Sequence, residues 1–137
     1  MNRRILYIVV HCTATHQSAT LDAILNYWEK ELGWSRPGYH YIIHPHGAIT
    51  PLYPENLLSN GVAGYNANSI HVCYIGGIDV KGKSIDNRTD AQKKALRDIL
   101  KELKLKYPDA IIQGHRDFPG VKKDCPCFDV KTEYQNL

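Results

Sequence analysis

Runs of apolar residues predict where the chain forms buried strands. Residues 5–10 (ILYIVV) are apolar at every position and rich in β-branched side chains, which is typical of a strand buried in the middle of a sheet. Residues 70–75 form a second strand-like run, which Gly76-Gly77 ends, and residues 110–113 form a shorter third one. Polar segments separate these runs, so the hydrophobic pattern predicts several short strands.

Two segments carry apolar residues at helical spacing. Residues 21–32 contain such a stripe, and Thr20 stands in front of it as the expected N-cap. A second stripe starts after Thr89 and Gln92, whose spacing is that of a capping box, and it ends before Pro108. These features predict two amphipathic helices.

A hairpin and a long loop complete the pattern. Two short extended runs, residues 39–43 and 48–52, flank residues 44–47 (HPHG), which predicts a hairpin. Residues 54–69 are rich in Gly, Asn and Ser, which favour turns, so we expect a long surface loop there. Strands that alternate with helices, together with one hairpin, predict an α/β fold with a central mixed β-sheet flanked by helices.

Composition and charge are those of an ordinary folded domain. The 137 residues correspond to one unit at roughly 150 residues per domain, so we expect a single domain over residues 1–137. Hydrophobic residues make up 43% and charged residues 23% of the chain, which excludes disordered, collagen-like and coiled-coil classes. Lys and Arg number 17 against 14 Asp and Glu. This excess is too small to indicate a nucleic-acid partner.

The first residues resemble a signal peptide, because basic residues precede an apolar run. The apolar run that ends before His11 is shorter than the roughly 7 to 15 residues of a signal-peptide core. No apolar run reaches the length of about 18 residues that a membrane span requires. We therefore expect no export signal, no lipid anchor at Cys12 and no membrane-spanning segment.

The seven histidines are the first candidates for chemistry. His11 and His115 each end a predicted strand, where open sheets present functional side chains. The other five have ordinary explanations. Histidines in turns are solvated, which is expected for His16, His44 and His46. Histidines in strands are usually buried against backbone groups, which is expected for His40 and His71.

A hydrolytic zinc site needs three protein ligands with nitrogen or sulfur donors and an open position for water. His11, His115 and either Cys125 or Cys127 would supply such a set. The four cysteines are expected to be reduced thiols or metal ligands, since a chain of this length needs no disulfide framework. A cysteine nucleophile is the rival, but Cys12 and its neighbour His11 would point to opposite faces of a strand.

Six motifs follow one another over nearly the whole chain. They are residues 11–15 (HCTAT), 38–43 (GYHYII), 64–70 (GYNANSI), 76–79 (GGID), 114–117 (GHRD) and 123–129 (KDCPCFD). In order and spacing they resemble the type 2 N-acetylmuramoyl-L-alanine amidases. The short bacteriophage lysozymes of amidase type look most similar, with the peptidoglycan recognition proteins as cousins.

The resemblance implies a catalytic zinc held by His11, His115 and Cys125, with Tyr39 and Lys123 as catalytic side chains. It implies hydrolysis of the amide between N-acetylmuramic acid and L-alanine in bacterial peptidoglycan. The expected protein is a bacteriolytic, monomeric endolysin of a phage or prophage, held in the cytoplasm until a holin-type pore releases it to the wall. Some relatives bind peptidoglycan without cutting it, so a non-catalytic binding module is the alternative.

The chain also departs from the family pattern. Cys127 replaces a small Ser or Gly, His71 replaces a glycine, and Gly61-Val62 stand where relatives often carry a histidine. Cys127 or His71 as a fourth ligand would instead make a closed, structural zinc site. We predict Cys125 as the cysteine ligand, because it precedes proline as the family ligand does and lies two residues after Lys123.

Overall fold

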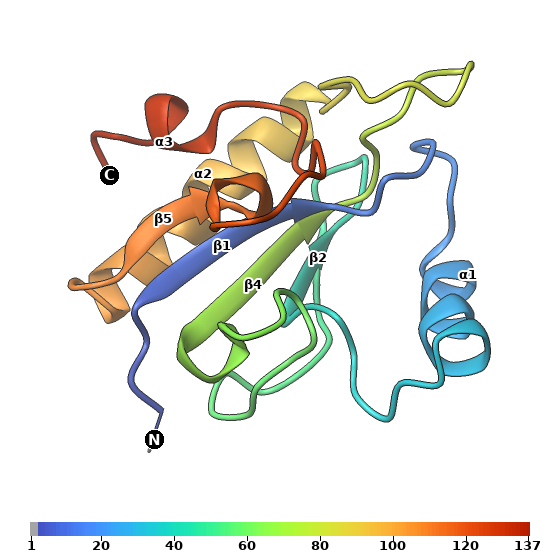
Figure 1. Ribbon diagram of the computed structural model, residues 1–137. Coiled ribbons are helices and arrows are strands. Elements are labelled where there is room, and N and C mark those ends of the chain that lie inside the picture. The colour runs from blue at the N-terminus through green and yellow to red at the C-terminus, as the bar shows by residue number, and fades with distance from the viewer. Residues whose placement is uncertain (1–2) are drawn as a thin grey trace.

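The computed structural model describes residues 3–137 and is built on a five-stranded mixed sheet with the order β3-β2-β4-β1-β5 (Figure 1). The interior strand β1 is parallel to both of its neighbours, β4 and β5, while β3 is an antiparallel edge strand. This confirms the predicted α/β fold with a mixed sheet. The strands are β1 (Tyr7–Cys12), β2 (Tyr41–Ile43), β3 (Ile49–Pro51), β4 (Ser69–Tyr74) and β5 (Ile111–Gly114).

The interior position of β1 follows from its apolar side chains, which are buried on both faces. Successive residues of a strand point to opposite faces. Ile8 and Val10 belong to the larger core, whereas Val9 lies in a separate cluster on the other face, and all three are inaccessible to solvent. The strand starts and ends two residues later than the predicted range of 5–10, so His11 lies within it, on the same face as Val9.

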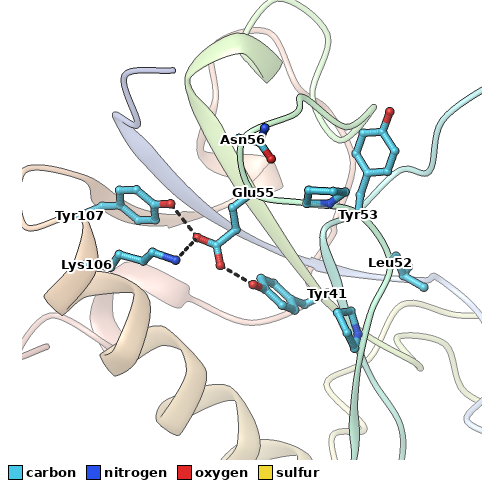
Figure 2. Close-up of a pocket in the computed structure, with 9 residues that line it drawn as sticks. Tyr41, Leu52, Tyr53, Glu55, Asn56, Lys106 and Tyr107 are labelled. Carbon is cyan, nitrogen blue, oxygen red and sulfur yellow. Dashed lines mark hydrogen bonds and ion pairs between the residues drawn. The ribbon is translucent and has the colours of Figure 1, made fainter. Parts of the chain in front are cut away.

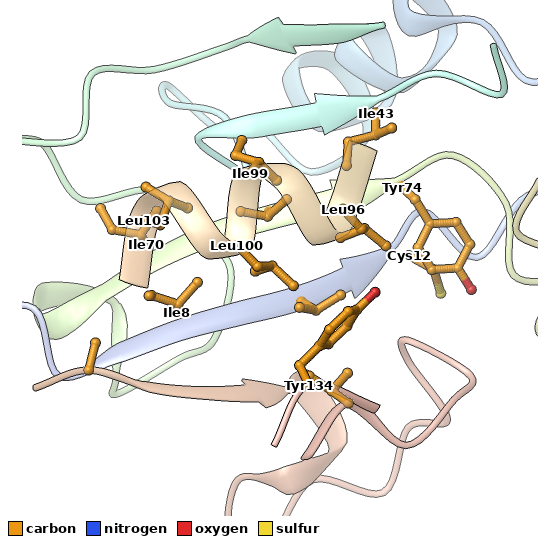
Figure 3. Close-up of a cluster of buried hydrophobic side chains, with 14 of the residues drawn as sticks. Ile8, Cys12, Ile43, Ile70, Tyr74, Leu96, Ile99, Leu100, Leu103 and Tyr134 are labelled. Carbon is orange, nitrogen blue, oxygen red and sulfur yellow. The ribbon is translucent and has the colours of Figure 1, made fainter. Parts of the chain in front are cut away.

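The larger core lies between the sheet and α2 (Asp90–Lys106), as Figure 3 shows. The predicted capping box is present: Gln92 N–H donates to Thr89 Oγ1 at 3.0 Å, and Thr89 N–H donates to Gln92 Oε1 at 3.1 Å. Full burial of one large aliphatic side chain stabilises a fold by about 1.5 to 3 kcal/mol, so this layer supplies much of the stability. Its central members are Ile8, Val10, Ile70, Val72, Leu96, Leu100 and Leu103.

The opposite face of the sheet carries a smaller apolar cluster beneath α1 (Leu21–Asn26). Thr20 caps this helix as predicted, accepting the N–H of Ala23 at 3.1 Å. The prediction of one α-helix through residue 32 is wrong in its second half, because Tyr27–Glu31 form a π-helical turn. This turn buries Trp28 among the apolar residues of β2 and β4.

The remaining connections agree with the sequence pattern. The hairpin of β2 and β3 and the long loop after it are present, and the loop ends in a 3₁₀ turn, η2 (Asn66–Asn68). A second 3₁₀ turn, η3 (His115–Asp117), follows β5, and α3 (Val130–Glu133) is a short C-terminal helix. No helix within residues 3–137 combines the length and apolar composition needed to cross a membrane.

Arg88 connects the C-terminal segment to the rest of the domain. Its side chain, only 1% exposed, bonds to Asp86 and Glu133 at 2.8 Å. The guanidinium also lies 3.4 Å above the centre of the Phe128 ring. These contacts fix the segment that follows Cys125 against the start of α2.

Arg88→Ala should therefore lower the free energy of unfolding by about 2 to 3 kcal/mol, since it removes charge-assisted hydrogen bonds and a cation–π contact. The loss is below that of a fully buried pair because Asp86 and Glu133 keep 31% and 41% of their side chains exposed. Urea denaturation measures it. Lys94→Ala is the control, since its pair with Asp98 is solvent-exposed and should leave stability unchanged.

Candidate metal centre

Three potential metal ligands converge at one end of the sheet. His11, His115 and Cys125 each offer one ligand atom, and these atoms lie within 4.8 Å of one another. His11 Nδ1 is 4.0 Å from Cys125 Sγ, and the two imidazole rings are 4.9 Å apart between centroids. Two imidazoles and a thiolate suit zinc, and three protein ligands leave its fourth tetrahedral position open. The donor set therefore fits zinc by its chemistry.

The parallel pairing of β1 and β5 brings the two histidines together. Val10 of β1 is opposite Gly114 of β5, so the residues that follow them, His11 and His115, are neighbours at the same edge of the sheet. His115 is the first residue of η3, directly after the end of β5. Two residues far apart in the sequence are thus placed by backbone hydrogen bonds rather than by flexible loops.

Cys125 comes from the C-terminal loop, which hydrogen bonds hold above the sheet. The backbone N–H of Cys12 donates to Cys125 Sγ at 3.2 Å. Tyr74 Oη donates to the carbonyl of the next residue, Pro126, at 2.6 Å. Gly114 permits this approach, because a Cβ there would lie 2.8 Å from Pro126 Cδ.

Burial keeps both histidines of the cluster neutral. It holds the pKa of His11 well below 6.5, and nearby His71, His115 and Lys123 lower it further. Burial, followed by the charge of Lys123, lowers the pKa of His115 to about 4. A neutral imidazole has a free lone pair, so both side chains are in the form that binds a metal at neutral pH.

Within residues 3–137, the other three cysteines lie outside the ligand cluster. Cys127 Sγ is 3.8 Å from Cys12 Sγ and 3.4 Å from the carbonyl of Gly77, and burial raises the pKa of this thiol to about 12. Burial also raises the pKa of Cys73. A hydrogen bond with Cys125, and then burial, raise the pKa of Cys12, which is 3% exposed. Cys12 is therefore unsuited to act as a nucleophile.

Two further histidines are fully buried beside the cluster. His40 bonds to backbone groups, as expected: its Nδ1 accepts His71 N–H at 3.0 Å, and its Nε2 donates to the carbonyl of Leu57 at 2.8 Å. It lies just before β2 rather than within a strand. For His71 the expectation of a backbone partner is wrong, because its ring contacts His11 Nε2 at 2.9 Å and Asn66 Oδ1 at 2.8 Å. Both ring nitrogens of His71 are thus engaged, and neither supplies a fourth ligand.

Comparison with known proteins assigns the family. The model of the family described as N-acetylmuramoyl-L-alanine amidase matches residues 1–128. The chain belongs to this family. The endolysin of Klebsiella phage KP32 is 42% identical over 131 residues, which are 93% of this chain and 84% of that relative. The resemblance to type 2 amidases inferred from the six motifs is therefore confirmed.

Solved structures of amidase-type proteins share the fold. The Ph2119 endolysin from Thermus scotoductus MAT2119 bacteriophage Ph2119 has a TM-score of 0.80 and 26% identity, over 93% of this chain and 80% of that one. The N-acetylmuramoyl-L-alanine amidase LysC from Clostridium intestinale URNW has a TM-score of 0.78 and 26% identity, over 96% and 83% of the two chains. The architecture of the amidase family is thus present along most of the chain.

In this amidase-family domain, the ligand cluster borders a cleft of about 740 Å³. One wall is aromatic and comes from α1 and the segment after it: the rings of Trp28 and Trp34 stack at 6.2 Å, and Tyr39 meets Trp28 edge-on at 5.3 Å. His115 and Cys125 line the polar end of the same cleft. An apolar wall beside a few convergent polar groups is typical of a ligand site.

Tyr39 and Lys123, which the resemblance marks as catalytic, also line this cleft. The Tyr39 ring lies 4.8 Å from that of His11, and its hydroxyl donates a long hydrogen bond, 3.5 Å, to the carbonyl of Cys12. Burial raises the pKa of Tyr39 well above 10, so its hydroxyl stays protonated. Lys123 is exposed, and its charge is close enough to lower the pKa of His115.

A second cleft, of about 720 Å³, lies near the start of β2 (Figure 2). At its centre Glu55 accepts hydrogen bonds from Tyr41 and from Tyr107, the latter at 2.6 Å, and pairs with Lys106 at 3.0 Å. Although burial alone would raise the pKa of Glu55, these bonds bring it below its usual value. These bonds connect the loop after β3 to the end of α2, and we assign the Glu55 cluster a structural role.

Proposed function

We propose that the protein is a zinc-dependent N-acetylmuramoyl-L-alanine amidase, which hydrolyses the amide between N-acetylmuramic acid and L-alanine in bacterial peptidoglycan. The observation that carries the proposal is the convergence of His11, His115 and Cys125 beside a cleft of an amidase-family domain. The phage endolysin and the clostridial amidase among its relatives support the same substrate.

His11, His115 and Cys125 would hold the zinc ion. Bound there, zinc supplies a Lewis acid that lowers the pKa of a coordinated water to about 7, which makes a nucleophile available near neutral pH. The neutral state of both imidazoles supports this role, because protonated histidines cannot bind the metal.

Lys123 is proposed to stabilise negative charge on the carbonyl oxygen of the scissile amide. Its side chain lines the same cleft as His115 and Cys125, in which we propose that the substrate binds. A positive charge placed where an oxyanion develops stabilises the transition state more than the ground state.

Tyr39 is proposed to position the reacting groups through its hydroxyl. This group holds its proton, because burial raises its pKa, and the 3.5 Å bond to the Cys12 carbonyl is weak enough to be exchanged for one to the substrate. The aromatic wall of Trp28 and Trp34 would bind the less polar faces of the muramyl peptide.

The proposed setting is that of a phage-type endolysin released to the cell wall, which the identity of 42% to the endolysin of Klebsiella phage KP32 supports. Binding without hydrolysis is the alternative function. The presence of a complete set of three donors, with Lys123 beside them, favours hydrolysis over binding alone.

Digestion of purified peptidoglycan should expose new L-alanine amino termini and leave the glycan strands uncut, because only the muramyl amide is hydrolysed. Amine labelling and mass spectrometry of the products measure this. New reducing sugars without free alanine amines would contradict the amidase assignment, and binding without either product would favour the non-catalytic alternative.

EDTA or a stronger chelator should abolish hydrolysis, and added zinc should restore it.

Lys123→Ala should reduce kcat about 100- to 1000-fold, the typical cost of removing one group that stabilises an oxyanion. Zinc content, measured by elemental analysis, should be unchanged, because Lys123 is not a ligand. Lys122→Ala is the matched control: it removes the neighbouring exposed charge, which does not line the cleft. Equal activity in the two variants would show that Lys123 is an ordinary surface residue.

Cys125→Ser should lose most of its zinc and all hydrolysis, because a hydroxyl is a poor zinc ligand near neutral pH. Cys127→Ser should keep both, since the Cys127 thiol is directed toward Cys12 and Gly77. Elemental analysis of both purified variants tests the pair. Full zinc occupancy in the Cys125 variant, or loss of zinc in the Cys127 variant, would contradict the proposed ligand set.

A further inference from the structure

The buried hydrogen bonds behind the ligand cluster form a chain whose direction is fixed at one end. Asn66 Oδ1 accepts the backbone N–H of Val62 at 2.7 Å. A backbone N–H can only donate, so the atom facing it must be the amide oxygen rather than the amide nitrogen. The same oxygen lies 2.8 Å from His71 Nε2. Because a carbonyl oxygen only accepts, His71 Nε2 must carry a proton.

This result determines the protonation of His71 Nδ1. The imidazole is fully buried, and the side chains that its two nitrogens contact, His11 and Asn66, carry no negative charge, so a charged ring would be buried without a counter-ion. Such burial is costly, and the ring is therefore neutral. A neutral imidazole carries one proton. Since that proton is on Nε2, Nδ1 has a free lone pair and acts as an acceptor.

The next bond transmits the constraint to a proposed zinc ligand. His71 Nδ1 is 2.9 Å from His11 Nε2, so His11 Nε2 must donate. The remaining nitrogen of His11, Nδ1, is then unprotonated, and it is the one that lies 4.0 Å from Cys125 Sγ. The hydrogen bond made by one ring nitrogen determines which nitrogen of a histidine is free to bind a metal.

We infer that His71 is a positioning residue of the metal centre: it accepts the Nε2 proton of His11 and so presents the Nδ1 lone pair of His11 to the site. Metal-binding histidines usually donate their second N–H to a carboxylate, a backbone carbonyl or water. Here a second imidazole takes that role, and Asn66 orients it in turn. The inference rests on the proposed zinc function.

Gly61 shows that space for this imidazole is built into the loop before β4. A Cβ at position 61 would lie 2.3 Å from His71 Nδ1 and 2.4 Å from its Cγ. Atoms cannot approach so closely, so any side chain at this position would displace the ring. A glycine here is required by the position of the His71 ring.

Two substitutions of similar polarity at position 71 distinguish a positioning role of His71 from a role in packing alone. The side-chain oxygen of Asn corresponds in position to Nδ1 of histidine, whereas the terminal amide of Gln corresponds to Nε2. His71→Asn therefore keeps an acceptor for His11, and His71→Gln loses it. His71→Gln should weaken zinc binding about 10- to 100-fold, the usual range for such partners, while His71→Asn should bind zinc nearly as tightly as the wild type.

Competition with a chromophoric chelator measures the zinc affinity of each purified variant. Equal affinities for the Asn and Gln variants would overturn the inference, because packing alone would be affected in both. Gly61→Ala is an independent test, since it displaces the His71 ring without changing any of the three hydrogen-bonded side chains, Asn66, His71 and His11. Its zinc affinity should fall as in His71→Gln, and a folded variant with wild-type affinity would also overturn the inference.

The unmodified protein provides a test that needs no variant to fold. Long-range ¹H–¹⁵N correlation spectra of the metal-free protein should show both His11 and His71 protonated at Nε2. A His11 ring protonated at Nδ1 would contradict the inference. Because this experiment contains no zinc, its failure is distinct from failure of the proposed function, which would appear as a wild-type protein that binds no zinc.

Discussion

The pairing register of β1 with its two parallel neighbours is the constraint on which the site depends. It places His11 beside the residue that follows β5, His115, and on the same face as His71 of β4. A slip of one residue would turn His11 into the apolar core beneath α2 and expose Val10 to the polar cluster. The free energy that selects the register by burying aliphatic residues therefore also determines the geometry of the candidate ligands.

The two faces of the sheet have different roles in the domain. The face beneath α2 is filled with aliphatic side chains and stabilises the fold. The other face buries imidazoles, which is tolerated because each ring has hydrogen-bond partners within the protein. Cys125, by contrast, lies on a loop without ladder hydrogen bonds of its own. The bond from Tyr74 and the contact of Arg88 with Phe128 hold that loop in place.

Features that depend on local sequence could be predicted well. The capping box of Thr89 and Gln92, the Thr20 cap and the apolar run of β1 act within a few residues, and the structure confirms them. The π-helical turn at Tyr27–Glu31 could not be predicted, because the burial of Trp28 against the sheet is a tertiary contact.

The candidate site could be predicted only in part. His11 and His115 stand out at strand ends, but spacing left the choice between Cys125 and Cys127 open, and the resemblance to a family was needed to favour one. The contact of His71 with His11 was missed, because it depends on the register between β1 and β4 and on a loop that brings Asn66 to the ring. The sequence marked His71 as a histidine where relatives have a glycine, but it could not show which side chain the imidazole contacts.

Two imidazoles and one thiolate of this chain are proposed to form an open zinc site. X-ray absorption spectroscopy at the zinc edge of the loaded protein tests it most directly. We expect one sulfur at about 2.3 Å and two imidazole nitrogens, with one further light-atom ligand, at about 2.0 to 2.1 Å. A first shell with two or more sulfurs, or with none, would contradict it.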